Sequence, residues 1–211
     1  DPSSQSCCTI GGNVAENAGG SHCLKYGVTT NHILGLELVL PNGDIVEIGK
    51  NGVLDTPGYD LLGLLTGSEG TLGIVTKITV RIMKNPESHK TVLAYFDRVS
   101  DGSQAVSDIV SSGIIPAALE MMDQTAIEGV EAASFPVGHP KDIEAVLLIE
   151  VDGIAAGIDE QIEQILDVCR NRHVREVKVA KDEQERASWW ANRKTGFGAM
   201  GAISPEYLVQ E

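Results

Sequence analysis

The strongest constraint on the fold of this sequence is a change in glycine content and in the spacing of apolar residues near Asn85 and Pro86. Before this point the chain is rich in glycine, and short apolar runs alternate with turns; after it, segments with strand and helix periodicity follow one another. Such a change favours two units of different architecture over one continuous core. We therefore expect one unit over residues 1–86 and a second unit over residues 87–211.

The first part is expected to form a small antiparallel sheet with long connecting loops. Residues 41–44 read Pro-Asn-Gly-Asp, which is typical of a tight turn between two paired strands. From Val75 onward apolar and polar residues alternate, as in a strand with one buried face. Residues 8–20 contain two double glycines and are interpreted as a loop. Strands are expected at residues 35–40, 45–48 and 73–83, and a short helix at residues 61–65.

The second part is expected to be an α+β unit. A strand–helix–strand order occurs twice, which is typical of a ferredoxin-like unit with its helices packed on one face of a sheet. Strands are predicted at residues 91–96, 118–122, 145–151 and 174–180, and helices at residues 102–112, 123–133, 158–171 and 182–194.

The charge balance excludes several classes of function. The chain has 30 acidic and 16 basic residues, a formal net charge of −14. An acidic surface repels nucleic acid and anionic membrane. No apolar run approaches the ~18 residues needed to cross a bilayer, and the first residues do not resemble a signal peptide. We therefore expect a cytoplasmic protein with no nucleic-acid partner and no transmembrane segment, whose site for an acidic substrate is a local basic pocket.

The cysteines suggest neither a metal centre nor a disulfide framework. Cys7 and Cys8 are adjacent, which does not fit a CxxC metal knuckle. Cys23 and Cys169 complete the set of four. All four are interpreted as buried, reduced thiols.

Two glycine runs are candidate cofactor loops. The first, from Thr9 to Gly20, has paired glycines that let backbone N–H groups approach a ligand and that reach positive φ at low cost. Asn13 and Asn17 tolerate the left-handed region and add amide groups. The alternative interpretation is a tight turn without a ligand.

The second glycine run, Thr66 to Thr76, enters the long predicted strand. Its spacing is neither that of a Walker loop nor that of a Rossmann fingerprint, so those phosphate-binding mechanisms lack their residues. A nicotinamide enzyme is therefore discarded. A glycine-spaced loop that feeds a strand can lay backbone amides along a flat heterocycle. The alternative is a bulged entry into the strand.

Together these runs resemble a known family. The stretches CTIGGNVAENAGGSHCLKYG, TGSEGTLGIVTKITV, ALEMMD, DEQERASWWANRK and ISPEYLVQ resemble flavoproteins of the vanillyl-alcohol oxidase type, over nearly the whole chain. The resemblance implies an α+β fold: part of the FAD-binding domain over residues 1–86, followed by part of a ferredoxin-like cap, or substrate, domain over residues 87–211.

The resemblance also implies which residues contact FAD. The first run would line the ribityl chain and the ring, and the second would hold another part of the cofactor through its backbone. Some relatives tether FAD covalently through a histidine; His22 lies near the first run, but packing is the favoured interpretation for it. The implied cofactor residues are Thr9, Ile10, Gly11, Gly12, Asn13, Asn17, Gly19, Gly20, Gly70, Gly73, Ile74 and Val75.

On the substrate side, the resemblance implies oxidation of a small 2-hydroxy acid, glycolate or D-lactate, with hydride passing to flavin N5. The arginine of the W-x-x-x-R stretch, Arg193, would bind the substrate carboxylate, for which a guanidinium fork is suited. Arg186, Trp189 and Trp190 are expected on the same helix face, and Tyr207 is a weaker candidate for substrate contact. The alternative is an exposed helix with ion pairs and core tryptophans.

Several expectations concern the whole enzyme. The family's histidine-rich metal segment would lie downstream and its pyrophosphate loop upstream; His89, His139 and His173 show no ligand spacing. We therefore expect an internal fragment without a metal site of its own, which neither holds FAD tightly nor turns over alone. Electrons would pass to partner subunits or a quinone, with a peripheral location at the inner membrane through such partners. The alternatives are a D-2-hydroxyglutarate or D-lactate dehydrogenase of the same fold, and a non-catalytic assembly module.

Overall fold

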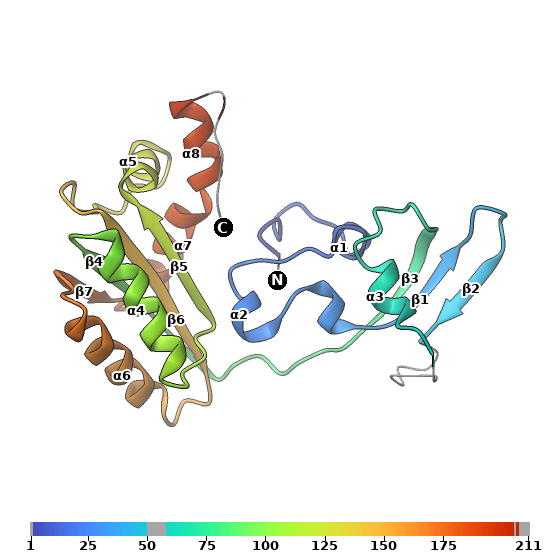
Figure 1. The fold of residues 1–211 in the computed structure, drawn as a ribbon, viewed down its shortest axis with the longest axis horizontal. Helices are drawn as coiled ribbons and strands as arrows, with labels where there is room; N and C mark the ends of the chain where they lie inside the picture. Colours follow the sequence, from blue (N-terminus) through green and yellow to red (C-terminus); the bar gives the residue numbers. More distant parts are fainter. Residues whose placement is uncertain (1, 50–57, 205, 207–211) are drawn as a thin grey trace. The chain divides into compact units, whose positions relative to one another are not determined.

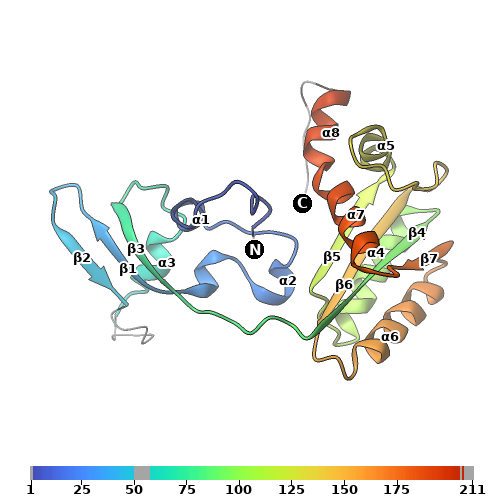
Figure 2. The same ribbon diagram turned by 180° about the vertical axis from the view of Figure 1, so that it is seen from behind.

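The protein divides into two compact units, Asp1–Asn85 and Pro86–Glu211, in a computed structural model. The structure describes residues 2–49, 58–204 and 206. Figures 1 and 2 show the helices and strands of each unit from opposite sides.

Unit 1 contains a three-stranded antiparallel sheet. The central strand β1 (Ile33–Val39) pairs with β2 (Ile45–Ile48) on one side and with β3 (Ile74–Val80) on the other. The predicted hairpin is confirmed, and the side chain of Asn42 stabilises its turn by accepting a hydrogen bond from the N–H of Asp44 at 3.1 Å. The third strand ends at Val80, before the predicted Met83.

The strict alternation predicted for the third strand is wrong. Val75 and Ile78 are its partly buried residues, and they lie three positions apart. The pairing of β3 with β1 shifts register between Glu37 and Leu38, and such an irregularity changes which side chains face the core.

The predicted loop at residues 8–20 is also wrong, because it contains the helix α1 (Ile10–Glu16). Thr9 begins the helix by accepting a hydrogen bond from the N–H of Gly12, and Asn17 ends it in the left-handed conformation. Two glycines disfavour a helix, but fully buried Val14 ties this one to the core of unit 1. The remaining short helices are α2 (Cys23–Tyr26), η1 (Thr29–His32) and α3 (Leu61–Leu65).

Unit 2 contains a four-stranded antiparallel sheet in the order β5-β6-β4-β7. This is the ferredoxin-like order, so the predicted fold class is confirmed. The two long central strands are buried along most of their length. The strands are β4 (Ser88–Phe96), β5 (Ala118–Asp123), β6 (Ala145–Gly153) and β7 (Glu176–Val179).

Helices cover both faces of this sheet, which corrects the prediction of one covered face (Figures 1 and 2). On one face, α4 (Val99–Ser111) and α6 (Ile158–Asn171) pack over a core that includes Val92, Ala94 and Phe96. The other face carries α5 (Gln124–Ala132) and α7 (Glu183–Lys194) over Leu93 and Tyr95. Successive residues of β4 therefore point into two cores. An unpredicted helix, α8 (Gly196–Ile203), packs against α5.

The cysteines differ from expectation in their burial. All four are free thiols, but Cys169 alone is buried, while Cys7 is exposed and Cys8 and Cys23 are partly exposed. Within the part of the chain that the structure describes, no helix combines the length and the apolar character needed to span a bilayer.

Candidate functional site

The first glycine run exposes backbone at the start of α1. The hydroxyl of Thr9 accepts a hydrogen bond from the N–H of Gly12 at 3.0 Å, which fixes the first turn. A Cβ atom placed on Gly11 would meet nothing within 4 Å, so this side of the turn is open. Ile10 is 56% exposed beside it. The turn therefore offers accessible backbone next to an apolar side chain.

The later residues of the same run have structural roles. Asn17 accepts a hydrogen bond from the N–H of Thr30 at 2.9 Å through its side-chain oxygen. A Cβ atom on Gly19 would lie 3.0 Å from the sulfur of Cys23, and the N–H of Gly20 donates to that sulfur at 2.9 Å. Contacts within unit 1 thus explain Asn17 and Gly19 without a ligand, and they use the backbone N–H of Gly20.

The second glycine run docks against the end of α1. The N–H of Gly67 donates to the carbonyl of Val14 at 2.8 Å, and the N–H of Glu69 donates to Ala15 at 2.9 Å. Gly67, Glu69 and Gly70 all have positive φ, at 87°, 53° and 73°. The two runs, about fifty residues apart in sequence, are therefore neighbours within unit 1.

The four predicted cofactor residues of the second run fall into two groups. Gly70 is exposed, and Ile74 is 62% exposed. Gly73 is buried, and a Cβ atom there would lie 2.9 Å from both Leu38 and the carbonyl oxygen of Val39. Val75 packs against the core. The exposed members of the predicted set are Thr9, Ile10, Gly12, Gly19, Gly70 and Ile74, and the partly exposed members are Gly11, Asn13, Asn17, Gly20 and Val75.

This open backbone fits the requirements of a flat, partly apolar cofactor. Residues without side chains allow close approach to main-chain groups, and exposed isoleucines supply apolar contact. His22 precedes α2, where its carbonyl accepts the N–H of Tyr26 at 3.0 Å.

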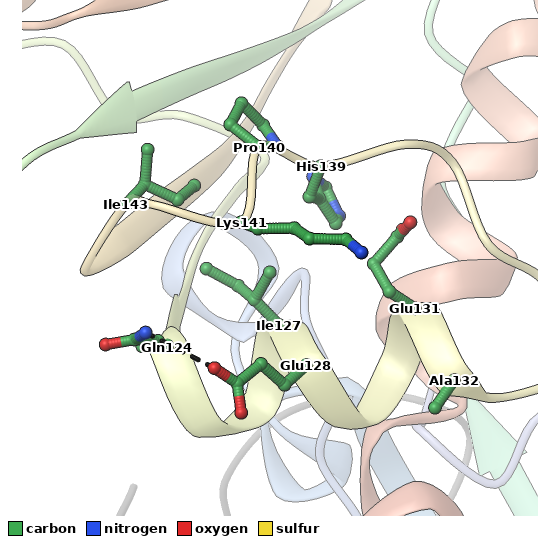
Figure 3. Close-up of a pocket in the computed structure, with 9 residues that line it drawn as sticks. All are labelled: Gln124, Ile127, Glu128, Glu131, Ala132, His139, Pro140, Lys141 and Ile143. Carbon is green, nitrogen blue, oxygen red and sulfur yellow. Dashed lines mark hydrogen bonds between the residues drawn. The ribbon is translucent and has the colours of Figure 1, made fainter.

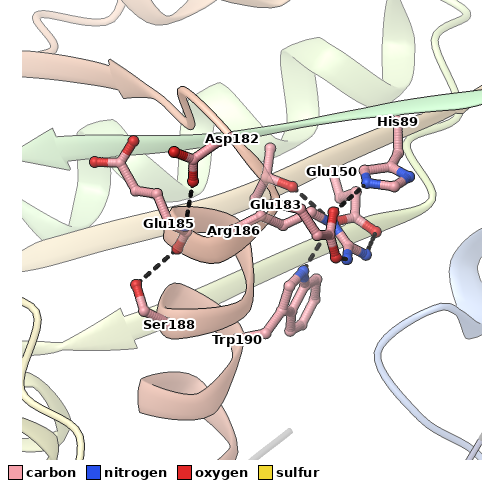
Figure 4. Close-up of polar contacts among 9 residues, drawn as sticks. His89, Glu150, Asp182, Glu183, Glu185, Arg186, Ser188 and Trp190 are labelled. Atoms are coloured by element: carbon pink, nitrogen blue, oxygen red, sulfur yellow. Dashed lines mark hydrogen bonds and ion pairs between the residues drawn. The ribbon is translucent and has the colours of Figure 1, made fainter.

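In unit 2, a buried carboxylate organises the helix that carries the predicted substrate arginine. Glu150, in the central strand β6, is 2% exposed. Its oxygens accept hydrogen bonds from Arg186 Nε at 2.8 Å and Nη2 at 2.9 Å, from Trp190 Nε1 at 2.8 Å and from the hydroxyl of Thr91 at 2.6 Å (Figure 4). The bond to Glu150 raises the pKa of Arg186. Two residues of α7 are thus fixed to the sheet.

The same network continues to the surface. Arg186 Nη1 donates to Glu183 at 2.8 Å, and the ring of His89 lies 2.8 Å from the other oxygen of Glu183 (Figure 4). The contact with His89 lowers the pKa of Glu183. Because Arg186 is held by two carboxylates, it is poorly placed to clamp a substrate.

Arg193 has a different environment. Its Nη2 donates to Glu120 on β5 at 2.5 Å, and the two side chains are 26% and 21% exposed. Its Nε is buried and has no hydrogen-bond partner among the described residues. Trp189 and Trp190 are nearly buried, at 5% and 7% exposure. The ion pairs and core tryptophans of the alternative interpretation are therefore present, although the helix is not freely exposed.

A second polar network on this face was missed by the sequence analysis. His139 is buried between the hydroxyl of Tyr95 at 3.2 Å and Asn192 Oδ1 at 3.1 Å. The amide nitrogen of Asn192 donates to the carbonyl of Phe135 at 2.8 Å. Asn192 Oδ1 must therefore accept, so His139 carries its proton on Nε2 and accepts from Tyr95 at Nδ1. Burial lowers the pKa of His139.

A surface pocket of about 410 Å³ lies beside α5, and none of its lining residues is a predicted site residue (Figure 3). One of its walls is Glu131, whose carboxylate accepts the N–H groups of Val137 and Gly138 at 2.8 and 3.0 Å and so holds the loop before His139. The pocket is lined by Gln124, Ile127, Glu128, Glu131, Ala132, His139, Pro140, Lys141 and Ile143.

Among the residues that the structure describes, no group of three or more His, Cys, Asp or Glu side chains is arranged to hold a metal ion. His89 and His139 belong to separate networks. Tyr207 lies outside the described residues.

The sequence contained one usable signal for the missed residues. In the strand Ala118–Asp123, Glu120 alternates with Ala118 and Met122, both of which are buried. A carboxylate on the apolar face of a strand requires a cationic or hydrogen-bonding partner. Glu150 occupies a comparable position in the apolar run at residues 145–151.

Comparison with known families gives two matches. Residues 85–211 match the family described as FAD linked oxidases, C-terminal domain. Residues 1–49 match the family described as FAD binding domain.

Curated relatives match over 92–100% of the chain. Glycolate oxidase subunit GlcD of Escherichia coli is 47% identical over 211 residues, covering 100% of this chain and 42% of the relative. The protein of that name from Bacillus subtilis is 41% identical, covering 100% and 45%. D-lactate dehydrogenase of Anaerostipes hadrus is 33% identical over 200 residues, covering 92% and 42%. The chain thus spans less than half the length of these relatives.

Solved structures support the fold. An alkyldihydroxyacetonephosphate synthase aligns with a TM-score of 0.77 at 20% identity, covering 96% of this chain and 39% of that one. A p-cresol methylhydroxylase with bound substrate aligns with a TM-score of 0.68 at 18% identity, covering 91% and 44%. At these identities the likeness concerns the fold alone.

Proposed function

The chain belongs to the family of FAD linked oxidases, whose C-terminal domain its residues 85–211 match, and on this premise we propose that it forms part of a flavoprotein that oxidises a small 2-hydroxy acid to the 2-oxo acid. Glycolate and D-lactate are the proposed substrates. The observation that carries this proposal is similarity over the whole chain to proteins named glycolate oxidase subunit.

We propose that the open backbone of unit 1 contacts FAD. The contacting residues would be the exposed members of the two glycine runs together with Gly11, where an added Cβ atom meets nothing: Thr9, Ile10, Gly11, Gly12, Gly19, Gly70 and Ile74. Asn13, Asn17, Gly20, Gly73 and Val75 would shape the loops that present them. The chemistry that FAD supplies when bound is acceptance of the hydride from C2 of the substrate.

On the substrate side, Arg193 would bind the carboxylate. A guanidinium N–H donates a charge-assisted hydrogen bond to a carboxylate oxygen, which would anchor the acid group of the substrate. Trp189 and Trp190 close the space beneath α7 and exclude water from it. Arg186 would support the helix without touching the substrate, because Glu150 and Glu183 hold it.

For the electron acceptor, we propose partner subunits or a quinone. Support comes from the names of the curated relatives, which describe a subunit of glycolate oxidase. A cytoplasmic location, peripheral at a membrane through such partners, accords with this assignment.

A D-lactate or D-2-hydroxyglutarate dehydrogenase is the second candidate. It is favoured by the 33% identity to a D-lactate dehydrogenase. These substrates share the 2-hydroxy carboxylate and differ in the group at C2. A third candidate, a non-catalytic assembly module, predicts a stable complex without oxidation of any hydroxy acid.

Anaerobic titration of the flavin-loaded protein that contains this chain separates these candidates. Glycolate, D-lactate, L-lactate and D-2-hydroxyglutarate are added in turn, and bleaching of the flavin absorbance is recorded. Reduction by glycolate and D-lactate at the lowest concentrations supports the proposal, and preferential reduction by D-2-hydroxyglutarate favours the second candidate. A protein that stays colourless with added FAD, or a flavin that no acid bleaches, contradicts both.

A further inference from the structure

We propose that Glu120 is a positioning residue that holds the guanidinium of Arg193 in the orientation that receives the substrate carboxylate. This inference rests on the proposed function, because it assigns a task to Arg193 in acid binding. It follows from three features of unit 2: the surroundings of Glu120, the way α7 is anchored, and the space around the Arg193 head group.

Glu120 is a carboxylate among buried apolar side chains of β5 and β6, on the face of the sheet that carries α5 and α7. Ala118 and Met122, two positions to either side on β5, are buried in the cluster that contains Trp189 and Trp190. Its neighbour across the strand pair, Leu148, is buried in the same cluster. Hydrogen bonding to Arg193 at 2.5 Å satisfies the charge of Glu120 in this setting.

The helix beneath Arg193 is fixed on both sides. Arg186 and Trp190 bind the buried carboxylate of Glu150, and Asn192 binds the carbonyl of Phe135 and the ring of His139. These anchors set the rotation of α7 about its axis, so the backbone of Arg193 has a defined place. Only the flexible side chain of Arg193 then remains to be ordered.

The contacts of Arg193 leave one direction open. Nη2 is used by Glu120, and Nε is buried without a partner among the described residues. Nη1 lies beside Gly196, where an added Cβ atom would come within 3.7 Å. This is ordinary van der Waals contact, and no hydrogen bond to a described residue uses Nη1. Nη1 is therefore the nitrogen that would donate to an external acceptor while Glu120 holds Nη2.

An ordered guanidinium binds an acid more tightly than a mobile one, because the entropy of its side chain is lost before the substrate arrives. A purely structural ion pair would affect folding but would have no specific effect on acid binding. The test therefore compares affinity for the acid with thermal stability.

The experiment uses the flavin-loaded protein that contains this chain and measures anaerobic flavin reduction against glycolate concentration. Glu120→Ala is expected to raise the apparent Kd about tenfold, with a smaller change in the limiting rate. Glu120→Gln keeps an oxygen that can accept from Nη2, and it is expected to retain most of the affinity. Thermal midpoints are measured in parallel.

A matched control lies on the opposite face of the sheet. Asp108 on α4 accepts a hydrogen bond from Arg172 at 2.5 Å, with side-chain exposures of 30% and 42%. Asp108→Asn removes an ion pair of similar geometry and is expected to leave the Kd unchanged.

Two further variants keep the test decisive. If Glu120→Ala does not fold, Glu120→Asp retains the charge but shortens the side chain by one methylene, and it is expected to raise the Kd. In an Arg193→Met background, Glu120→Ala is expected to cause no additional weakening, because Glu120 acts through Arg193.

The possible outcomes distinguish failure of the proposed function from failure of the role proposed for Glu120. A wild-type flavin that no 2-hydroxy acid reduces overturns the proposed function and this inference with it. A wild type that is reduced, with Arg193→Met weakened and the Glu120 variants unchanged in Kd, overturns this inference alone. Additional weakening by Glu120→Ala in the Arg193→Met background also overturns it.

Discussion

At the scale of single residues, the polar face of unit 2 is defined by hydrogen-bond pairing. Glu150, His139 and Asn192 are buried, and each has partners that match its donors and acceptors. Arg193 Nε is the exception among the described side chains. Buried polar groups without partners are costly, so this exception supports the proposal that Arg193 has a role beyond stability.

The buried His139 predicts a dependence of stability on pH. Its pKa in the folded state lies below the ordinary value of 6.5, mainly because burial disfavours the charged ring. The unfolded chain therefore binds the proton more readily than the folded protein. The stability that neutral His139 contributes is complete above about pH 6.5, and it is lost as the pH falls towards the pKa of His139 in the folded state. Denaturant unfolding between pH 7.5 and 5 is expected to show decreasing stability.

Two variants test the assignment to His139. His139→Gln keeps an amide that can donate to Asn192 but does not titrate, and it is expected to flatten this part of the pH profile. His173→Asn, at an exposed position with φ of 58°, serves as control and is expected to keep the wild-type slope. An unchanged slope in His139→Gln would show that another group is responsible.

At the scale of elements, α7 shows how a polar helix can be held on an apolar sheet. The helix has buried tryptophans, and its cap residue Asp182 accepts the N–H of Glu185 at 2.8 Å. The decisive contact is the bidentate pair between Arg186 and Glu150, in which a buried carboxylate meets a mostly buried guanidinium. Removing one partner of such a pair leaves an uncompensated charge.

Substitution of Glu150 is therefore expected to be strongly destabilising. Glu150→Ala leaves Arg186, Trp190 Nε1 and the Thr91 hydroxyl without their shared acceptor, and a loss of about 3–5 kcal/mol in the free energy of unfolding is expected. Glu183→Gln alters the exposed end of the same network and is expected to change stability little. Urea unfolding measures both, and equal effects would contradict the buried network as the anchor.

The glycines of the two runs in unit 1 differ in whether the surrounding structure leaves room for a side chain. Gly73→Ala places a Cβ atom 2.9 Å from Leu38 and from the carbonyl oxygen of Val39, so a loss of about 1–3 kcal/mol is expected. Gly11→Ala meets nothing within 4 Å in a helical turn and is expected to preserve or slightly increase stability. If backbone near Gly11 contacts FAD, this variant weakens FAD binding, measured by flavin fluorescence, although its fold is intact.

At the scale of the whole molecule, each of the two units has hydrophobic cores built only from its own residues. Both cores of unit 2 are built from residues after Pro86, and the core of unit 1 is built from residues before it. A polypeptide of residues 86–211 is therefore expected to fold alone and to unfold cooperatively. Circular dichroism and heat denaturation measure this, and a non-cooperative transition would show that the cores depend on unit 1.

Local patterns were sufficient to predict most elements. Helix α6 and helix α3 lie where periodicity predicts them, and the Pro-Asn-Gly-Asp turn marks the hairpin. Local sequence did not predict the elements whose structure depends on long-range contacts. Helix α1 contains two glycines and forms because Val14 is buried. Strand β3 departs from alternation where the register of its pairing with β1 shifts. A short segment does not contain the partner that stabilises it.

The sequence by itself determined the α+β class, the order of the strands and of the main helices of unit 2, and the family to which the chain belongs. Only the tertiary structure decided that Arg193 pairs with Glu120, that Arg186 is held by Glu150, and that the two glycine runs meet at the end of α1. The physical reason is that periodicity reports which face of an element is apolar, whereas the partner of a buried charge or an open N–H comes from a distant segment.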